Sequence, residues 1–265
     1  MKQRVITAVI FGVVLISLTI IGGIPFIALS YLFSSIAVYE LLKMKNVKIV
    51  SLPGIASLVV LWIFLLPDQY TFILEYLNVT KAEVALLTVL LFLTYTVVTK
   101  NRFTFDDVAF ILMSTIYIGI GFYYFIETRE AGLVFIFYAI FIIWATDSGA
   151  YLVGRKLGKR KLWPEISPNK TIEGAIGGII SAVIVSLLFS LLTSIDAGMF
   201  KLAILTVFLS VFGQIGDLVE SALKRHYHVK DSGHILPGHG GILDRFDSLL
   251  FTAPLVYYYV KLFII

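Results

Sequence analysis

Long apolar runs, each near the length that crosses a bilayer, constrain this chain more than any other feature. About 20 consecutive apolar residues span a membrane as a helix, and we find nine such runs among the 265 residues. Only 14% of the residues are charged, against about a quarter in a soluble domain. The sequence therefore predicts an all-α, polytopic transmembrane protein with about nine helices. The runs cover residues 5–21, 24–41, 51–66, 82–99, 105–126, 131–153, 171–193, 200–223 and 243–263.

The distribution of basic residues predicts how these runs cross the membrane. With nine spans, the N-terminus shares one side with the loops after spans two, four, six and eight. Together with Arg245 at the start of the ninth run, those segments hold 17 of the 21 Lys and Arg residues, and cytoplasmic segments are the ones enriched in these residues. We therefore expect a multi-pass protein of the cell (inner) membrane with a cytoplasmic N-terminus. No small-residue cleavage site follows the first run, so we expect it to be retained as a helix.

Residue types exclude some chemistries. The chain has no cysteine, which excludes disulfides, thiolate metal sites and cysteine nucleophiles. All four histidines fall between residues 226 and 239, but their spacing matches no helical zinc pattern. A hard-cation site held by carboxylates is therefore favoured over a zinc site.

Two carboxylates, Asp147 and Asp217, lie deep inside predicted spans. Asp147 precedes Arg155 by eight residues, and Asp217 precedes Lys224 by seven. At 1.5 Å per residue, these spacings place the carboxylates about 12 Å and about 10 Å below the basic boundary. A charge at that depth is costly, and it usually lines a wet cavity or pairs with a buried Lys or Arg. Either arrangement fits these two residues.

The segment before residue 172 combines a turn with a helix start. Ser167 and Pro168 predict a turn, Asn169 and Thr171 can each cap the helix that follows, and Lys170 lies beside its first turn. A helix N-terminus next to a lysine can bind a phosphate group. We therefore expect Lys170 to contact phosphate.

The densest polar segment, residues 221–247, holds the groups that a phosphate-transfer site requires. Mg²⁺ takes one or two carboxylates and completes its shell with substrate phosphates and water. Asp217 and Asp244 can supply those carboxylates, and Asp247 lies one helical turn after Asp244. We therefore expect Asp217 and Asp244 to be Mg²⁺ ligands, with Asp247 as a supporting or second-metal carboxylate.

The same segment resembles the signature of the phosphatidate cytidylyltransferases, also called CDP-diacylglycerol synthases. In that signature, a serine precedes an apolar residue and Lys-Arg, followed by Lys-Asp, an apolar-Pro pair, His-Gly-Gly and Asp-Arg-apolar-Asp. The upstream segments DSGAYLVGRKLG and SPNKTIEGAIGG are similar too, so the resemblance covers about residues 140–250. The matching positions are Ser221, Leu223, Lys224, Arg225, Lys230, Asp231, Gly233, Leu236, Pro237, His239, Gly240, Gly241, Ile242, Asp244, Arg245, Phe246 and Asp247.

The resemblance implies a Mg²⁺-dependent reaction of CTP with phosphatidate that gives CDP-diacylglycerol and pyrophosphate. We expect a phosphatidate oxygen to attack the α-phosphorus of CTP in line, with positioning and charge neutralisation carrying the rate. The expected partners are CTP, phosphatidate and membrane lipid, with no nucleic acid; a homodimer is left open. The residues expected to be catalytic are Asp217, Asp244, Asp247, Lys224 and Arg245. Those expected to bind substrate are Asp147, Lys170, Ser221, Arg225, Lys230, Asp231, His239, Gly240 and Gly241.

Two other functions remain open. A CTP-dependent lipid or polyprenol kinase would transfer the γ-phosphoryl group, and a cation-coupled transporter would use Asp147 and Asp217 as relay groups. Every deep carboxylate and every histidine follows residue 140. We therefore expect residues 131–265 to form the catalytic region and residues 1–130 to be a scaffold or a subunit contact.

Overall fold

The computed structural model describes residues 2–193 and 198–264, and the chain divides into two compact units. The first unit contains Met1–Glu127 together with the later segment Ser232–Leu243. The second contains Thr128–Asp231 and Asp244–Ile265. The first unit therefore includes 12 residues that the sequence analysis assigned to the C-terminal catalytic region.

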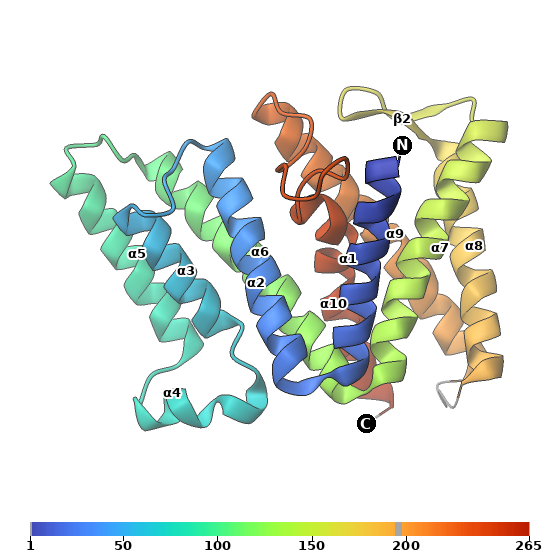
Figure 1. Ribbon diagram of the computed structural model, residues 1–265, viewed down its shortest axis with the longest axis horizontal. Coiled ribbons are helices and arrows are strands. Elements are labelled where there is room, and N and C mark those ends of the chain that lie inside the picture. Colours follow the sequence, from blue (N-terminus) through green and yellow to red (C-terminus); the bar gives the residue numbers. More distant parts are fainter. Residues whose placement is uncertain (1, 194–197, 265) are drawn as a thin grey trace. The chain divides into compact units, whose positions relative to one another are not determined.

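Helices dominate both units (Figure 1). Among the residues that the structure describes, seven helices are long and apolar enough to cross a membrane, or eight if the bent pair after residue 51 counts as one span. The predicted multi-pass, all-α class is confirmed, whereas the count of nine spans is not. Two of the nine predicted runs form helices that are too short or too polar to count among these seven. Helix α3 (Leu52–Phe64) has only 13 residues, and four of the 21 residues of α10 (Leu243–Phe263) are charged.

The first unit begins with an antiparallel helix pair. The chain reverses at Gly22 and Gly23, whose φ angles of 69° and 54° lie in the left-handed region that favours glycine. Phe26 of the second helix packs against Phe125, with ring centroids 4.9 Å apart. The helices of this unit are α1 (Lys2–Ile21), α2 (Gly23–Met44), α3, the 3₁₀ turn η1 (Asp68–Tyr70), α4 (Phe72–Tyr76), α5 (Lys81–Val98) and most of α6 (Phe105–Ala131).

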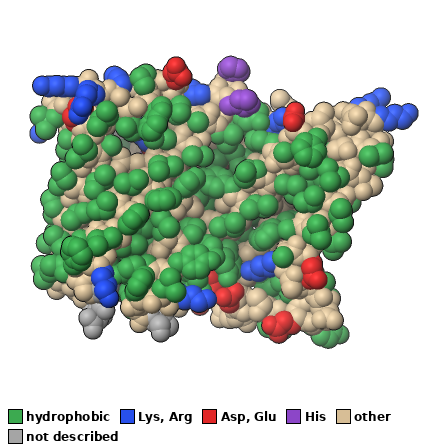
Figure 2. All heavy atoms as spheres, turned by 180° about the vertical axis from the view of Figure 1, so that it is seen from behind, with side chains coloured by type: hydrophobic (Ala, Val, Ile, Leu, Met, Phe, Trp, Pro, Cys, Tyr) green, Lys and Arg blue, Asp and Glu red, His purple; other side chains and the backbone are tan. Residues whose placement is uncertain are grey.

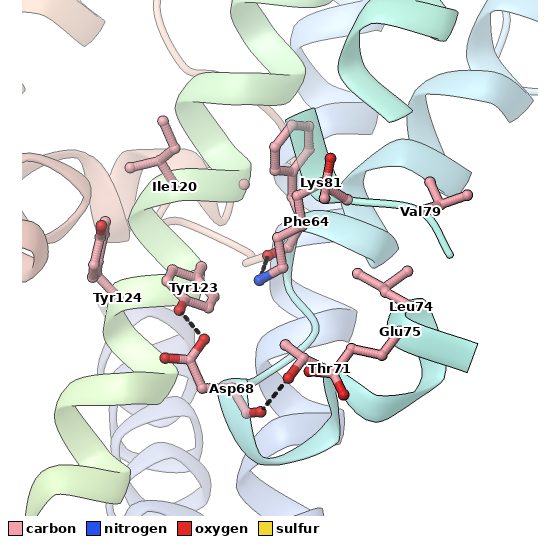
Figure 3. A pocket seen from close by; sticks show the side chains of 12 residues that line it. Phe64, Asp68, Thr71, Leu74, Glu75, Val79, Lys81, Ile120, Tyr123 and Tyr124 are labelled. Carbon is pink, nitrogen blue, oxygen red and sulfur yellow. Dashed lines mark hydrogen bonds between the residues drawn. The ribbon is translucent and has the colours of Figure 1, made fainter. Parts of the chain in front are cut away.

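The bend between α3 and α4, about 100°, borders a pocket of about 530 Å³. Lys81 points from α5 to the end of α3, where its ammonium donates to the carbonyl of Phe64 at 3.2 Å (Figure 3). The same ammonium donates to the carbonyl of Leu66, two residues after α3, at 2.7 Å. Tyr123 donates to Asp68 at 2.6 Å. Backbone groups freed at a break within a membrane protein must find such partners. We therefore interpret the hydrogen bonds of these polar side chains as stabilising the bend.

The second unit is built on four long helices with a shared apolar core. Its elements are α7 (Leu133–Leu157), β1 (Lys161–Trp163), β2 (Ser167–Thr171), α8 (Ile172–Leu192), α9 (Met199–His226) and α10. Tyr138 of α7 lies in this core, and its hydroxyl is 2.6 Å from that of Thr206 on α9. The buried core residues are Phe135, Tyr138, Ala139, Ile142, Ala182, Leu202, Leu205, Leu209, Val256 and Val260.

Glycines bring α7 and α8 close together. A Cβ on Gly178 would lie 2.8 Å from the carbonyl oxygen of Thr146, and one on Gly177 would overlap Val153. Only glycine permits helix backbones to approach so closely. Thr146 also donates to Ser210 of α9 at 3.0 Å, so one residue of α7 contacts both neighbouring helices.

A two-stranded antiparallel hairpin, β1 with β2, connects α7 to α8 (Figure 1). The predicted turn at Ser167 and Pro168 is wrong, because both residues lie in β2 and the chain turns at residues 164–166. Proline is tolerated in such a strand because a two-stranded sheet has free edges. Thr171 caps α8 as expected, accepting from the Gly174 N–H at 3.1 Å.

The outer surface of the helices is apolar. Figure 2 shows hydrophobic side chains over most of the visible face, with charged side chains gathered toward its upper and lower edges. Large side chains on this surface include Val9, Leu87, Ile180 and Phe208, each more than half exposed. In water such a surface would aggregate, so it indicates contact with lipid.

Candidate active site

A pocket of about 480 Å³ lies within the second unit, lined by residues of α7, β2, α8 and α9. It combines apolar walls with charged and amide side chains, which is the usual composition of a small-molecule site. Its polar lining consists of Asp147, Tyr151, Arg155, Asn169, Lys170, Thr171, Gln214 and Asp217. The two deep carboxylates predicted from the sequence therefore border one cavity.

A lysine–aspartate pair spans this pocket. The ammonium of Lys170, on β2, lies 2.6 Å from a carboxylate oxygen of Asp217, on α9. The hydroxyl of Ser221, one helical turn after Asp217, is 3.3 Å from the other oxygen. Asp147 is close enough to interact electrostatically with Asp217, Lys170 and Arg245. The hairpin thus places Lys170 in contact with Asp217 of α9 and within electrostatic range of Asp147 of α7.

A second lysine joins α9 to the first turn of α10. Lys224 lies 2.7 Å from Asp244 and 2.5 Å from Glu220. The Glu220 side chain is only 1% exposed and that of Asp244 only 7%. Glu220 was not predicted from the sequence, although its spacing of four residues from Lys224 places the two side chains on one helix face.

Asp247, one turn further along α10, belongs to the same electrostatic cluster. It interacts with the carboxylates of Asp217 and Asp147 and with Lys224. Carboxylates this close to one another repel, so their arrangement favours a cation among them. In the structure, Lys170 and Lys224 supply that positive charge.

The donor set suits a hard divalent cation. Its members are carboxylates and a hydroxyl, the oxygen donors that Mg²⁺ prefers. Within the described ranges 2–193 and 198–264, no group of three or more His, Cys, Asp or Glu side chains could hold a metal by itself. Mg²⁺ needs only one or two protein carboxylates when substrate phosphates complete its shell. The residues present therefore fit a Mg²⁺ ion that binds together with a phosphate-bearing substrate.

Other predicted site residues lie outside the lysine–aspartate pairs. Arg225 is exposed, and its Nε lies 3.4 Å from the Ile166 carbonyl in the hairpin turn. Lys230 and Asp231 are exposed and lie at the end of the segment Thr128–Asp231 of the second unit. Arg245 is exposed on α10.

The remaining predicted residues, His239, Gly240 and Gly241, belong to the first unit. They lie in residues 232–243, the signature loop. Leu236 donates to the Gly240 carbonyl at 3.0 Å, and the His239 N–H donates to the Leu236 carbonyl at 2.8 Å. Gly240 has a φ of 82°, which explains why glycine is needed there. The loop therefore has a defined backbone conformation.

A membrane-embedded helical fold, with lysines and carboxylates around a pocket, is the arrangement of a membrane enzyme that acts on phosphate groups. A model of the Cytidylyltransferase family matches residues 2–263. The chain belongs to this family. The similarity thus covers nearly the whole chain, beyond the segment 140–250 in which the sequence motifs resemble it.

Curated relatives agree with this assignment. The chain is 58% identical to a phosphatidate cytidylyltransferase of Bacillus subtilis, over 99% of this chain and 98% of the relative. It is 49% identical to a phosphatidate cytidylyltransferase of Staphylococcus haemolyticus, and 48% identical to one of Staphylococcus saprophyticus. Each of these two alignments covers 97% of both chains. The resemblance to this family is therefore confirmed.

Proposed function

We propose that this chain transfers the cytidylyl group of CTP to phosphatidate, forming CDP-diacylglycerol and releasing pyrophosphate. The observation that carries the proposal is the Lys170–Asp217 pair at a pocket between membrane helices. Relatives that share about half of its residues or more are named phosphatidate cytidylyltransferases. One substrate is a lipid and the other a soluble triphosphate, so a polar pocket bounded by lipid-facing helices suits both.

The chemistry requires positioning more than proton transfer. A phosphate oxygen of phosphatidate forms a bond to the α-phosphorus of CTP, and the bond from that phosphorus to the bridging β-oxygen breaks. The nucleophile is already an anion, so no general base is needed. Lys170 holds positive charge at the pocket where the phosphate groups would enter. Lys224 holds positive charge deeper, beside Asp244, and Arg245 can add a bidentate contact.

Asp217 and Asp244 are the residues that would hold Mg²⁺, which when bound neutralises phosphate charge and orients the leaving group. Each of these carboxylates is paired with a lysine in the structure. With a cation on Asp217, Lys170 would be available to phosphate oxygens, whereas Lys224 would still be paired with the buried Glu220. Both lysines thus keep the carboxylates paired before substrate binds, and Lys170 would contact the substrate afterwards.

The pocket should open to the cytoplasm. Lys170 and the basic hairpin residues Arg160 and Lys161 follow the end of α7, and basic segments favour the cytoplasmic face. CTP would then enter from water, while phosphatidate would enter from the headgroup layer without leaving the bilayer.

Radiolabelled CTP tests the proposed reaction. Purified protein in phosphatidate-containing vesicles with Mg²⁺ should incorporate label from the α-phosphorus into lipid and release labelled pyrophosphate from the γ-position. Incorporation of γ-label into lipid would instead indicate a lipid kinase, and no incorporation of either label would favour transport. Asp217→Asn, assayed in parallel, identifies label transferred by a contaminating enzyme.

A further inference from the structure

Glu40, near the end of α2, is a carboxylate with only 1% of its surface exposed. It accepts hydrogen bonds from the Ser232 hydroxyl (3.0 Å), the Ile242 N–H (2.9 Å) and the Leu243 N–H (3.0 Å). All four residues belong to the first unit. Burying a carboxylate is costly unless donors match its oxygens, so these contacts fix the loop relative to α2.

Two of the three donors lie at the start of α10. The first N–H groups of a helix have no partner within the helix and need an acceptor from outside. A negative charge is also favourable at this end of a helix. Here the acceptor comes from another helix, about 200 residues earlier in the chain. Glu40 therefore caps α10 at the residue immediately before Asp244.

The glycines of the signature loop leave room for this carboxylate. A Cβ on Gly233 would overlap the Glu40 carboxylate, and a Cβ on Gly241 would overlap both Glu40 and the Ser232 hydroxyl. From the sequence, Gly241 was expected to bind substrate. In the structure, its missing side chain allows Glu40 to reach the loop backbone.

We propose that Glu40 is a positioning residue for cytidylyl transfer, acting through the signature loop and the first turn of α10. The inference rests on the proposed function. One carboxylate oxygen accepts the N–H of Ile242, just before α10, and the other accepts the N–H of Leu243, its first residue. A shift of α2 or of the loop therefore breaks at least one bond. Misplacement of a reacting group by about 1 Å can cost about 100-fold in rate. Residues 1–130 would then contribute to catalysis through the hydrogen bonds by which Glu40 fixes residues 232–243.

The decisive variant is Glu40→Gln, which keeps the shape but replaces one acceptor oxygen with an N–H donor. That donor must face either the Ile242 N–H or the Leu243 N–H, so one backbone bond is lost. We expect kcat to fall about 10- to 100-fold and half-maximal activity to need more Mg²⁺, because Asp244 follows the released backbone. A purely structural role would lower the amount of folded enzyme without moving the Mg²⁺ dependence.

Ser34→Ala is the matched control. Ser34 is buried on the same helix, but its hydroxyl donates to the Tyr31 carbonyl of that helix at 3.1 Å. Its removal should leave both kcat and the Mg²⁺ dependence unchanged.

Loop release can be measured independently of activity. In this cysteine-free chain, Ile242→Cys introduces a thiol at a position that is 1% exposed. Its alkylation should be slow with Glu40 and at least about tenfold faster with Glu40→Gln, because the protecting backbone bond is lost. Unchanged alkylation together with wild-type kcat and Mg²⁺ dependence would overturn the proposal.

Ser232→Ala keeps the test decisive if Glu40→Gln does not fold. It removes one donor and leaves both backbone bonds, so kcat should fall by about 3- to 10-fold. Wild-type kinetics in this variant would overturn the proposal.

The wild-type chain distinguishes failure of the proposed function from failure of the proposed role of Glu40. If it transfers no α-label, the proposed function fails; if it does so and the variants match it, only the role of Glu40 fails.

Discussion

Lys170 and Lys224 each contact an aspartate that was expected to bind metal, and the two pairs differ in their surroundings. The Lys170–Asp217 pair borders the pocket. Lys224 instead lies between Asp244 and the almost fully buried Glu220. The first pair is accessible to a ligand, whereas the second is enclosed by protein. Substitution should therefore affect mainly activity at the first pair, and both activity and stability at the second.

Asp217→Asn should lower kcat by at least about 100-fold while the protein stays folded, because the carboxylate is expected to act on the transition-state charge. Lys170→Met should raise the KM for CTP or phosphatidate and lower kcat. Steady-state kinetics with each substrate varied, with melting curves as a folding check, measure both effects. If Lys170→Met lowers the melting temperature but leaves the kinetics unchanged, the pair serves packing alone.

Lys224→Met should destabilise the protein by about 3–5 kcal/mol, because it leaves buried carboxylates without their cation. The measurement is the unfolding midpoint in detergent. Arg160→Gln is the comparison, since it removes an exposed pair with Glu173 in which the arginine side chain is 72% exposed. Such a pair contributes only about 0–1 kcal/mol. Equal effects of the two substitutions would contradict the enclosed character of the Lys224 cluster.

Helices α7 and α8 bring the hairpin and its lysine to the pocket, and their glycine contact sets the distance between them. Asp147 lies on the same stretch of α7 as Thr146, whose carbonyl faces Gly178. A wider gap between the helices would therefore shift Asp147 relative to Lys170. At this scale, packing and site geometry depend on the same few residues.

Gly177→Ala should destabilise the protein by about 1–3 kcal/mol through overpacking against Val153, and it should also reduce activity. Gly12→Ala is the matched control, because a Cβ there meets nothing within 4 Å and α1 is helical. The control should be neutral or slightly stabilising, since alanine favours the helix. Thermal unfolding and α-label transfer by both variants test this. If Gly177→Ala changed neither the stability nor the activity, the close contact of Gly177 with Val153 would be disproved.

For the whole molecule, the charge distribution predicts which ends of the helices face the cytoplasm. His234→Cys, on the exposed part of the signature loop, should react with an impermeant maleimide only after cells are permeabilised. Tyr76→Cys, at the last position of α4, which is 90% exposed, should react in intact cells. Mg²⁺ with CTP should slow the reaction at position 234 alone. The reverse labelling pattern would invert the proposed orientation.

The sequence was sufficient for features that depend on local pattern. Apolar length located the helices, and Thr171 was identified as a cap because capping acts over three residues. It was not sufficient where a partner lies far along the chain. Glu40 bonds residues 192 to 203 positions away, and no periodicity links them. Pro168 also misled, because proline is compatible with both a turn and an unpaired strand edge.

The capping of α10 by Glu40 has a consequence for synthesis of the chain. At about 5–20 residues per second, the 192 residues between Glu40 and Ser232 take roughly 10–40 s to emerge from the ribosome. During that time α2 is complete, but its glutamate lacks these loop donors. Glu40 lies only four residues before the last residue of α2, so water and headgroups at the interface can solvate it while it waits. Synthesis of residues 232–243 thus completes a contact whose acceptor, on α2, was made much earlier.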